Sequence, residues 1–522
     1  MRRYNHALAV FIILVATAWF VILFTSQTHV HSDEAIIGLM GKHILQGRYL
    51  PFYMYGQSYN SGAAWEAYLA AIAFALFGVS AISLKGCIVV LSVLCLFLFY
   101  RMCLALYDPQ TSLVATISFA LAPSLLKWHF QVRGYSWYFL SIPVLTMLFA
   151  SIESARDANR KTAFFFGLAS GIGIWCLELV LPLVGVLWTL LILRRRLSVT
   201  TAAVALLGFI TGYASVIAFN FTHHFANWRY VFIEKPGGGF SSLFHLSAFT
   251  RIFLDEMPKF FGPDTILWYY PEKPPIGYLF YGIAILATGF AIWPFAASPS
   301  KIVRALRGDL SDQSQTRDFD MLMLTAAAFV PYLTQSVGVP SYFFGGCFFL
   351  SVLTGRMLRR LFSSSQSLPR LAGAGVLAAI LAGGVAVMIR AAGKNQIETL
   401  CLCQEGKNYC MTRIPGADME EVEQYLRQHN VTSVWTTISF VYPFLFESDE
   451  VPAVSNAIFE YPHRVYPSKI PWREPNLDPD AAFIIETDSP FRRQLEGHFT
   501  QAFGRVPSVK EFGKLTLVAK QD

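Results

Sequence analysis

Two adjacent carboxylates, Asp33 and Glu34, occur a few residues after a long apolar run at residues 7–25. A carboxylate at a membrane surface can act as a general base that takes the proton of an acceptor hydroxyl. This chemistry suits group transfer from a phosphate leaving group, which needs no proton donor at neutral pH. In the alternative interpretation, Ser32 and the two acids cap a helix that continues toward Gln46, because acids favour a helix N-terminus. Both roles can hold together.

A second candidate group is cationic and lies in the stretch LLKWHFQVRGYSW. Lys127, His129 and Arg133 are close in sequence there, and Tyr135 follows them. An arginine can grip two phosphate oxygens in a bidentate fork, so we favour Arg133 as the phosphate ligand, with Lys127 second. Alternatively, these cations extend toward lipid headgroups without binding a substrate.

Glu178, in GIGIWCLELVLP, is an acid within a pair of apolar segments. An intramembrane acid is costly and by default marks a site or a polar partner. We expect Glu178 near the outer end of its helix, facing the cavity that holds the acid pair. Alternatively, it simply reaches the membrane interface at a helix end.

Metal-binding residues are not evident in the sequence. His223 and His224 could join His31 and Asp33, but no tight ligand spacing appears. We therefore predict no metal site and no firmly implied cofactor. A divalent cation is a minor alternative.

The composition limits the class of protein. The chain has 522 residues, of which 54% are hydrophobic and 14% charged, and its mean hydropathy is +0.45. A soluble protein of this length needs more charge to cover its surface, so we predict a multi-spanning membrane protein. The net charge of +7 is modest, and the basic residues occur in short clusters between apolar runs. This pattern indicates topology signals and argues against nucleic acid as a partner.

The basic clusters also predict how the chain crosses the membrane. Twelve apolar segments can be counted, and all five basic clusters share one face only if residues 63–79 do not cross. That segment is short for a span of about 20 residues, so we predict a juxtamembrane helix in the first outer loop. The expected fold is an all-α domain of about 11 transmembrane helices over residues 1–392. Its N-terminus would be cytoplasmic, in the cytoplasmic (inner) membrane.

The remaining residues, 393–522, differ in character. A helical pattern in DMEEVEQYLRQHN is followed by short β-type runs, which predicts a small α/β domain outside the cytoplasm. Three cysteines fall in this tail, and an oxidising compartment would permit a bridge from Cys410 to Cys401 or Cys403. Docking of an acceptor and covering of the site both remain open as roles for this domain.

The first outer loop resembles that of GT-C superfamily membrane glycosyltransferases, in the branch of protein O-mannosyltransferases and lipid A aminoarabinose transferases. The resemblance rests on Asp33-Glu34, on the stretch Gly56-Gln57-Ser58-Tyr59 and on Leu76-Phe77-Gly78. It covers about sixty residues closely and implies Asp33 as the base, Glu34 as an assisting group, and substrate contacts from Gln57 and Tyr59. It also implies a polyprenyl-phosphate sugar donor. The chain departs from the family where relatives often have an Arg-Tyr pair, since Ser341 precedes Tyr342 here. Tyr342 stays a candidate.

The hypothesis is an inverting glycosyltransferase that moves a sugar from a polyprenyl phosphate to an acceptor hydroxyl on the outer membrane face. The acceptor is a glycan, a lipid or a protein, and the sequence does not choose among them. A transporter or flippase of lipid-linked saccharides is the main alternative. Transport usually needs polar groups near mid-membrane and often uses duplicated halves, and neither is visible here. A scaffold whose outer tail binds a partner is a third possibility.

Overall fold

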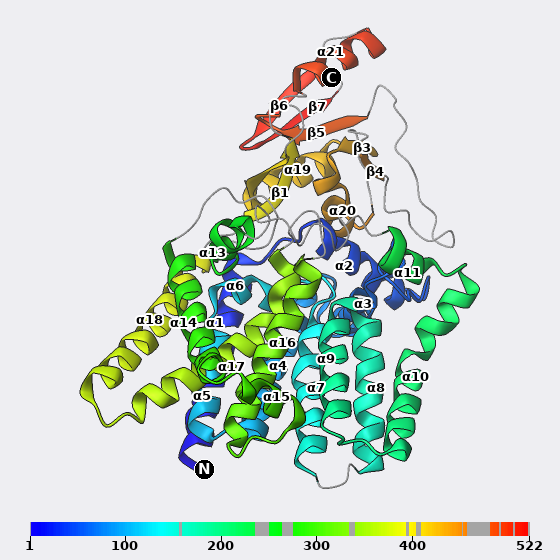
Figure 1. The fold of residues 1–522 in the computed structure, drawn as a ribbon. Helices are drawn as coiled ribbons and strands as arrows, with labels where there is room; N and C mark the ends of the chain where they lie inside the picture. Colours follow the sequence, from blue (N-terminus) through cyan, green and yellow to red (C-terminus); the bar gives the residue numbers. More distant parts are fainter. Residues whose placement is uncertain are drawn as a thin grey trace.

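The computed structural model describes residues 2–155, 159–234, 250–263, 275–333, 340–392, 396–402, 409–450, 453–456, 481–489, 492–504 and 507–519. A helical bundle forms most of it, and a small sheet domain follows near the C-terminus (Figure 1). The first helices are α1 (Arg2–Ser26), α2 (Ser32–Leu45), α3 (Ser61–Phe77), α4 (Ala81–Leu106), α5 (Pro109–Ala120), α6 (Pro123–Leu126), η1 (Lys127–His129), α7 (Ser136–Ser154), α8 (Arg160–Cys176), η2 (Glu178–Val180), α9 (Leu181–Leu193) and α10 (Val199–Thr222). They are followed by α11 (Ala226–Arg229), η3 (Tyr230–Glu234), η5 (Arg251–Glu256), α13 (Met257–Phe260), α14 (Pro275–Ala296), α15 (Ser300–Arg307), α16 (Gln313–Leu333), η6 (Pro340–Phe343), α17 (Phe344–Phe362) and α18 (Ser367–Ala391).

The long apolar helices confirm a multi-pass membrane protein. Within the described ranges, six helices are long and apolar enough to cross a membrane, namely α1, α4, α7, α10, α14 and α18. Helix α5 with α6 and η1 passes the same test as one span that is bent by 65°. Helix α8 has 17 residues and α9 has 13, so both are short for a span. The eleven crossings counted in the sequence therefore stay a prediction.

The juxtamembrane segment predicted at residues 63–79 is helix α3. It has 17 residues and does not meet the length of a span. Figure 1 shows α2 and α3 at the end of the bundle that carries the C-terminal domain. The second half of α3 exposes large apolar side chains, because Ile72 is 58% exposed and Phe77 is 77% exposed. This exposure is typical of a helix that meets lipid.

Helices α8 and α10 pack through glycines. Gly167 and Gly171 on α8 have the same spacing as Gly208 and Gly212 on α10. A Cβ atom at any of these four positions would clash with the backbone of the opposite helix. Small residues four apart allow helices in a membrane to approach closely, which strengthens van der Waals packing.

The C-terminal domain contains two sheets. Strands β1 (Gln396–Leu402) and β2 (Tyr409–Pro415) form an antiparallel pair whose register sets Cys401 opposite Cys410. The second sheet has the order β4-β3-β5-β7-β6, in which β3 is parallel to β4 and β5, and β7 is antiparallel to its neighbours. Its strands are β3 (Ser433–Thr436), β4 (Ala453–Asn456), β5 (Ala482–Glu486), β6 (Ser508–Phe512) and β7 (Leu515–Ala519), with helices α19 (Gly416–Gln428), α20 (Ile438–Glu447) and α21 (Arg492–Phe503). An α/β tail is thus confirmed. The predicted bridge from Cys410 to Cys401 or Cys403 stays a prediction, because Cys403 lies outside the described residues.

The C-terminal domain packs on α2. The Phe446 ring, from α20, lies so close to Gly38 that a Cβ there would press on the ring carbons. Two polar contacts follow it along α2: an ion pair at 2.7 Å between Lys42 Nζ and an Asp449 oxygen, and a hydrogen bond at 3.1 Å between His43 Nε2 and a Glu450 oxygen. Since α3 packs along the same helix, α2 is buried along most of its length.

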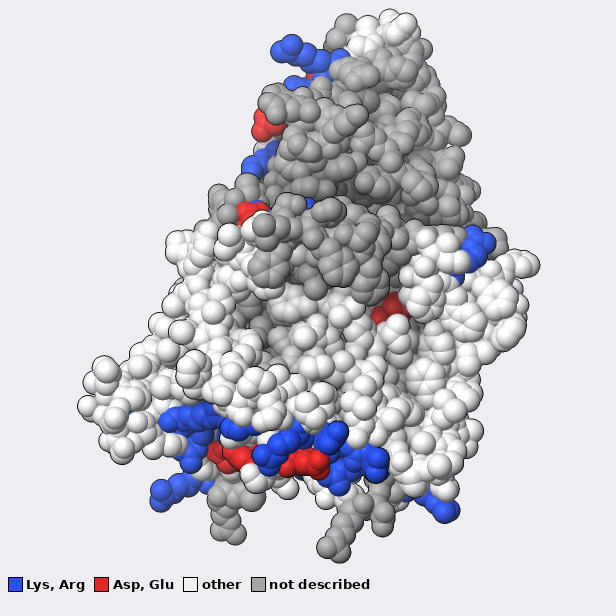
Figure 2. Space-filling view, in the orientation of Figure 1, with Lys and Arg blue, Asp and Glu red and all other residues white. Residues whose placement is uncertain are grey.

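The opposite end of the bundle is strongly charged. Figure 2 shows a band of Lys and Arg across that end, below a wide belt of uncharged side chains. The buried Arg194, which follows α9, donates hydrogen bonds to both carboxylate oxygens of Asp320 and lies 3.5 Å from Glu153. It also donates to the carbonyl of Ala305. One guanidinium therefore ties the ends of α7, α9, α15 and α16 together.

We expect Arg194→Ala to lower the free energy of unfolding by roughly 3–5 kcal/mol, because it leaves the buried Asp320 without its partner. The measurement is thermal unfolding of the purified chain in detergent. The matched control is Arg195→Ala, since Arg195 is the exposed neighbour and loses the same charge. Equal losses in the two variants would contradict the role of the buried pair.

Candidate active site

The acid pair lies in the first turn of α2. The Glu34 side chain accepts a hydrogen bond from the backbone N–H of His31 at 3.1 Å, which satisfies one donor at the start of the helix. The capping interpretation therefore holds for Glu34. Asp33 is partly exposed, whereas the Glu34 side chain is 1% exposed.

Besides the His31 N–H, two groups from distant parts of the chain hold Glu34. Lys85 Nζ, on α4, lies 3.1 Å from one carboxylate oxygen, and the backbone N–H of Val132 donates to the other oxygen at 3.3 Å. Burial would raise the pKa of Glu34, but the charge of a protonated His31, the charge of Lys85 and the backbone N–H donor of His31 together hold it below its usual value. The ionised carboxylate thus fastens the start of α2 to α4 and to the loop before α7.

The loop before α7 carries Arg133 toward the acid pair. Arg133 Nε donates to His31 Nε2 at 3.2 Å, and its guanidinium lies 5.9 Å from the centre of the Trp128 ring. Burial lowers the pKa of His31 to about 4, and the Arg133 charge acts in the same direction, against the attraction of Glu34. A neutral His31 can accept this hydrogen bond, as the geometry requires. His31 is therefore the neighbour that links Arg133 to the turn containing Asp33.

A second buried acid supports the loop from α3. Glu66 accepts hydrogen bonds from the backbone N–H of Gly134 at 2.7 Å and of Ser136 at 3.0 Å, and Asn60 donates to the Arg133 carbonyl at 3.1 Å. Gly134 has a φ of +84°, and a Cβ there would clash with Asn60, so only glycine fits. Burial raises the pKa of Glu66 to about 7, although the two N–H donors act against this. The loop holding Arg133 is thus fixed on two sides.

The other loop candidates differ in exposure. Lys127 is partly exposed at the start of η1, and Tyr135 packs against Trp128 with 4.6 Å between ring centres. His129 is 3% exposed and stacks on Trp19 at 3.9 Å between ring centres. Substrate contact through His129 would require this packing to open. Among the candidates in this loop, His129 therefore has the least structural support as a substrate contact.

The remaining candidates form a second group around Asn227. The Asn227 side chain donates to Glu178 at 3.1 Å and to the carbonyl of Ser58 at 2.8 Å. Tyr59 stacks on Tyr230 with 4.2 Å between ring centres. The predicted residues Gln57, Tyr59 and Glu178 therefore lie near one another, at the junction of the first loop with the α8–α9 break.

Tyr342 is partly buried in η6 and packs against the main hydrophobic core. Its predicted contact with substrate stays a prediction.

For a metal, the described residues contain no group of three or more His, Cys, Asp or Glu side chains placed to hold an ion.

Sequence reasoning missed the residues that position the acid pair and the loop. Lys85, Glu66 and Asn60 do so through Glu34, Gly134 and Arg133. A signal existed for two of them. Lys85 is a lone cation at the start of an apolar segment and Glu66 is a lone acid in another, and each such residue calls for a partner.

We expect Glu34→Gln and Lys85→Gln each to destabilise the chain, and the double variant to lose less than the two losses added. The physical reason is that either single change leaves one buried charge without its partner. A double-mutant cycle on thermal unfolding in detergent should give a coupling energy of about 1–3 kcal/mol. Additive losses would show that the pair does not act as a unit.

The chain was compared with known families, sequences and structures. No protein-family model and no curated protein sequence matches the chain. Solved structures do match. ArnT from Cupriavidus metallidurans bound to undecaprenyl phosphate has a TM-score of 0.58 at 12% identity, over 98% of this chain and 99% of that one. The same protein in its apo state gives 0.54 at 13% identity, over 99% of this chain and 100% of that one.

An oligosaccharyltransferase structure also matches the chain. The Archaeoglobus fulgidus oligosaccharyltransferase, tethered to an acceptor peptide, has a TM-score of 0.50 at 12% identity, over 86% of this chain and 63% of that one. Both proteins are GT-C superfamily glycosyltransferases. At such low identity the likeness concerns the fold. The chain has the GT-C fold that the resemblance of its first loop predicted.

Proposed function

We propose that the chain is a membrane glycosyltransferase that moves a sugar from a polyprenyl-phosphate donor to an acceptor hydroxyl. One observation carries the proposal: Arg133 is bonded to His31 next to the turn that presents the partly exposed Asp33. A base and a phosphate ligand are the two groups that this reaction needs. The GT-C fold and the undecaprenyl phosphate bound to ArnT support the choice of donor.

Asp33 is assigned as the base because its side chain is partly exposed, whereas that of Glu34 is buried. Both oxygens of Glu34 hold protein groups, and its side chain is 1% exposed. A base must reach the proton that it removes, which the partly exposed Asp33 can do. Glu34 thus acts as a positioning residue for the turn that presents Asp33.

The reaction balances with these groups alone. The acceptor O–H bond breaks, its proton passes to the Asp33 carboxylate, and the oxygen attacks the anomeric carbon. The bond from that carbon to the phosphate oxygen breaks, and the polyprenyl phosphate leaves with the electron pair. Attack opposite the leaving group inverts the anomeric configuration. Arg133 and Lys127 stabilise the charge that develops on the phosphate.

The membrane placement follows from the donor. A polyprenyl tail stays in the bilayer, so only the phosphate and sugar must reach α2 and the loop before α7. The proposal places this end on the outer face of the cytoplasmic membrane, with the N-terminus on the cytoplasmic side. The C-terminal domain, which packs on α2, would lie beside the route of a glycan, lipid or protein acceptor.

We expect Asp33→Asn to lower turnover by at least about 10²-fold, because the amide cannot take the acceptor proton. The assay follows release of polyprenyl phosphate from a panel of polyprenyl-phosphate sugars in membranes containing the full chain. The same product forms whichever acceptor the membranes supply, and a flippase would not release it. The control is Asp309→Asn, an exposed carboxylate on α15's C-terminal side. Unchanged release with Asp33→Asn would remove Asp33 from the mechanism.

We expect Arg133→Gln to lower the same rate by about 10²-fold, since one charged donor to the leaving phosphate is lost. Arg133→Lys should retain more activity, because it keeps the charge but loses the fork. Arg390→Gln is the matched control at an exposed arginine of α18. If Arg133→Gln behaved like Arg390→Gln, the phosphate would have another ligand.

A further inference from the structure

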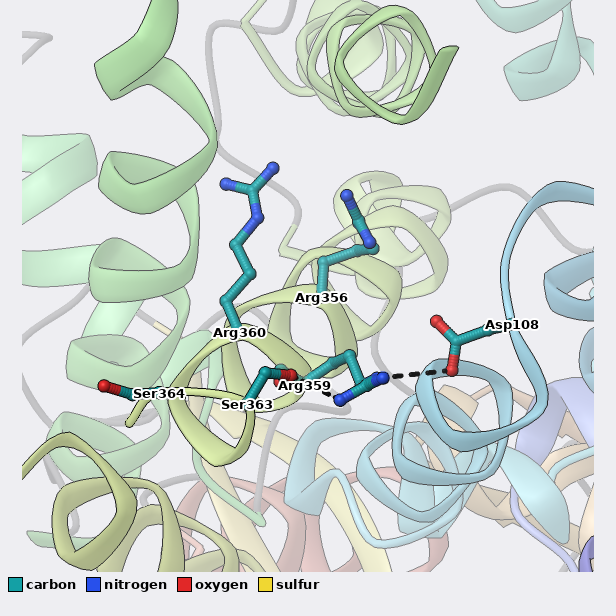
Figure 3. Close-up of a pocket in the computed structure, with 6 residues that line it drawn as sticks. All are labelled: Asp108, Arg356, Arg359, Arg360, Ser363 and Ser364. Carbon is teal, nitrogen blue, oxygen red and sulfur yellow. Dashed lines mark hydrogen bonds and ion pairs between the residues drawn. The ribbon is translucent and has the colours of Figure 1, made fainter. Parts of the chain in front are cut away.

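A separate pocket lies where α17 ends beside the start of α5. Its volume is about 550 Å³, and it is lined by Asp108, Arg356, Arg359, Arg360, Ser363 and Ser364 (Figure 3). Helix α4 separates it from the candidate active site, since Lys85 pairs with Glu34 near one end of α4 and Asp108 follows the other end. At 1.5 Å per residue, these ends are about 30 Å apart. The pocket is therefore distinct from the catalytic machinery.

The pocket has more positive than negative charge. Arg356 and Arg360 share a single carboxylate, that of the buried Asp318, at 2.9 Å and 2.6 Å. Arg359 lies 3.6 Å from Asp108, and Figure 3 shows it turned toward that acid. Three arginines thus face two carboxylates. An anion in the pocket would meet the remaining charge.

The spacing of the arginines favours a phosphate group. Arg356 and Arg360 are four residues apart on α17 and both reach the Asp318 carboxylate, while Figure 3 shows Arg359 on the Asp108 side of the pocket. Each guanidinium carries five N–H donors and stays charged at every physiological pH. The side chains of Arg359 and Arg360 are 38% and 31% exposed, and Arg359 also donates a hydrogen bond to the Ser363 hydroxyl. Such a set can bind several oxygens of one phosphate.

We propose that this arginine pocket binds the phosphate of an anionic phospholipid headgroup in the leaflet at this end of the bundle. Apolar surface next to the pocket favours a lipid over free phosphate. Helix α18 starts three residues after Ser364, and its first turns expose Leu368 (76%) and Leu371 (68%). Acyl chains can lie along these leucines while the headgroup phosphate meets the arginines, and basic pockets between membrane helices bind lipids in this way.

Two other arginines at this end of the bundle lack this arrangement. Arg304 and Arg307 on α15 are exposed and line no part of this pocket. If only the general positive charge of this membrane face mattered, substitution of any of these arginines would weaken lipid binding equally. Selective dependence on Arg359 would instead indicate a built site.

The test measures lipid bound to the full chain in detergent by native mass spectrometry. We expect phosphatidylglycerol to stay bound at concentrations at which phosphatidylcholine does not. Arg359→Gln should weaken phosphatidylglycerol binding about tenfold, as expected for loss of one charged phosphate contact. Arg359→Lys should weaken it less, because the charge remains. The control, Arg307→Gln, should change it by less than about threefold.

Three results would overturn the proposal. The first is equal binding of the two lipids by the unmodified chain. The second is an equal loss in Arg359→Gln and Arg307→Gln, which would indicate the general charge of this face. The third is full displacement of phosphatidylglycerol by millimolar inorganic phosphate, which would identify free phosphate as the occupant. Arg359 is partly exposed and Arg359→Lys keeps its charge, so that variant still tests the site if Arg359→Gln does not fold.

Discussion

The buried carboxylate of Glu34 is the constraint on which the candidate site depends. It receives the charge of Lys85 from α4, an N–H from its own helix turn and an N–H from Val132 in the loop before α7. A buried charge is tolerated only when such partners surround it. Three segments far apart in the chain must therefore meet at this point, and Asp33 and Arg133 are carried there with them.

The adjacent acids have different roles because a helix turns by about 100° per residue. Glu34 points into the interior, where its oxygens are taken up by protein groups, while Asp33 faces partly outward. The same principle applies on the other side of the loop, where Glu66 receives two backbone N–H groups. Two buried acids thus hold the backbone of the segments that carry Asp33 and Arg133.

The sequence predicted what depends on local pattern and missed what depends on tertiary pairing. The start of α2, the helix at residues 63–79 and the α/β tail all follow from periodicity and composition. Lys85 and Glu66 were not assigned because their partners lie 51 and 68 residues away, and one sequence does not reveal such pairs. Broken helices complicate a count of spans: α8 and α9 are short and meet at Glu178, and α5 bends by 65° into α6 and η1. A hydropathy count treats such broken helices as full spans.

Helix α2 joins the C-terminal domain to the candidate site. Its first turn carries Asp33, and two and a half turns later Lys42 and His43 pair with Asp449 and Glu450. Between them, the Phe446 ring fills the space that Gly38 leaves open. A helix held at both ends and in the middle can hardly tilt without breaking one of these contacts. The docked domain therefore fixes the direction in which α2 presents its acid, even though no residue of that domain needs to touch the reacting atoms.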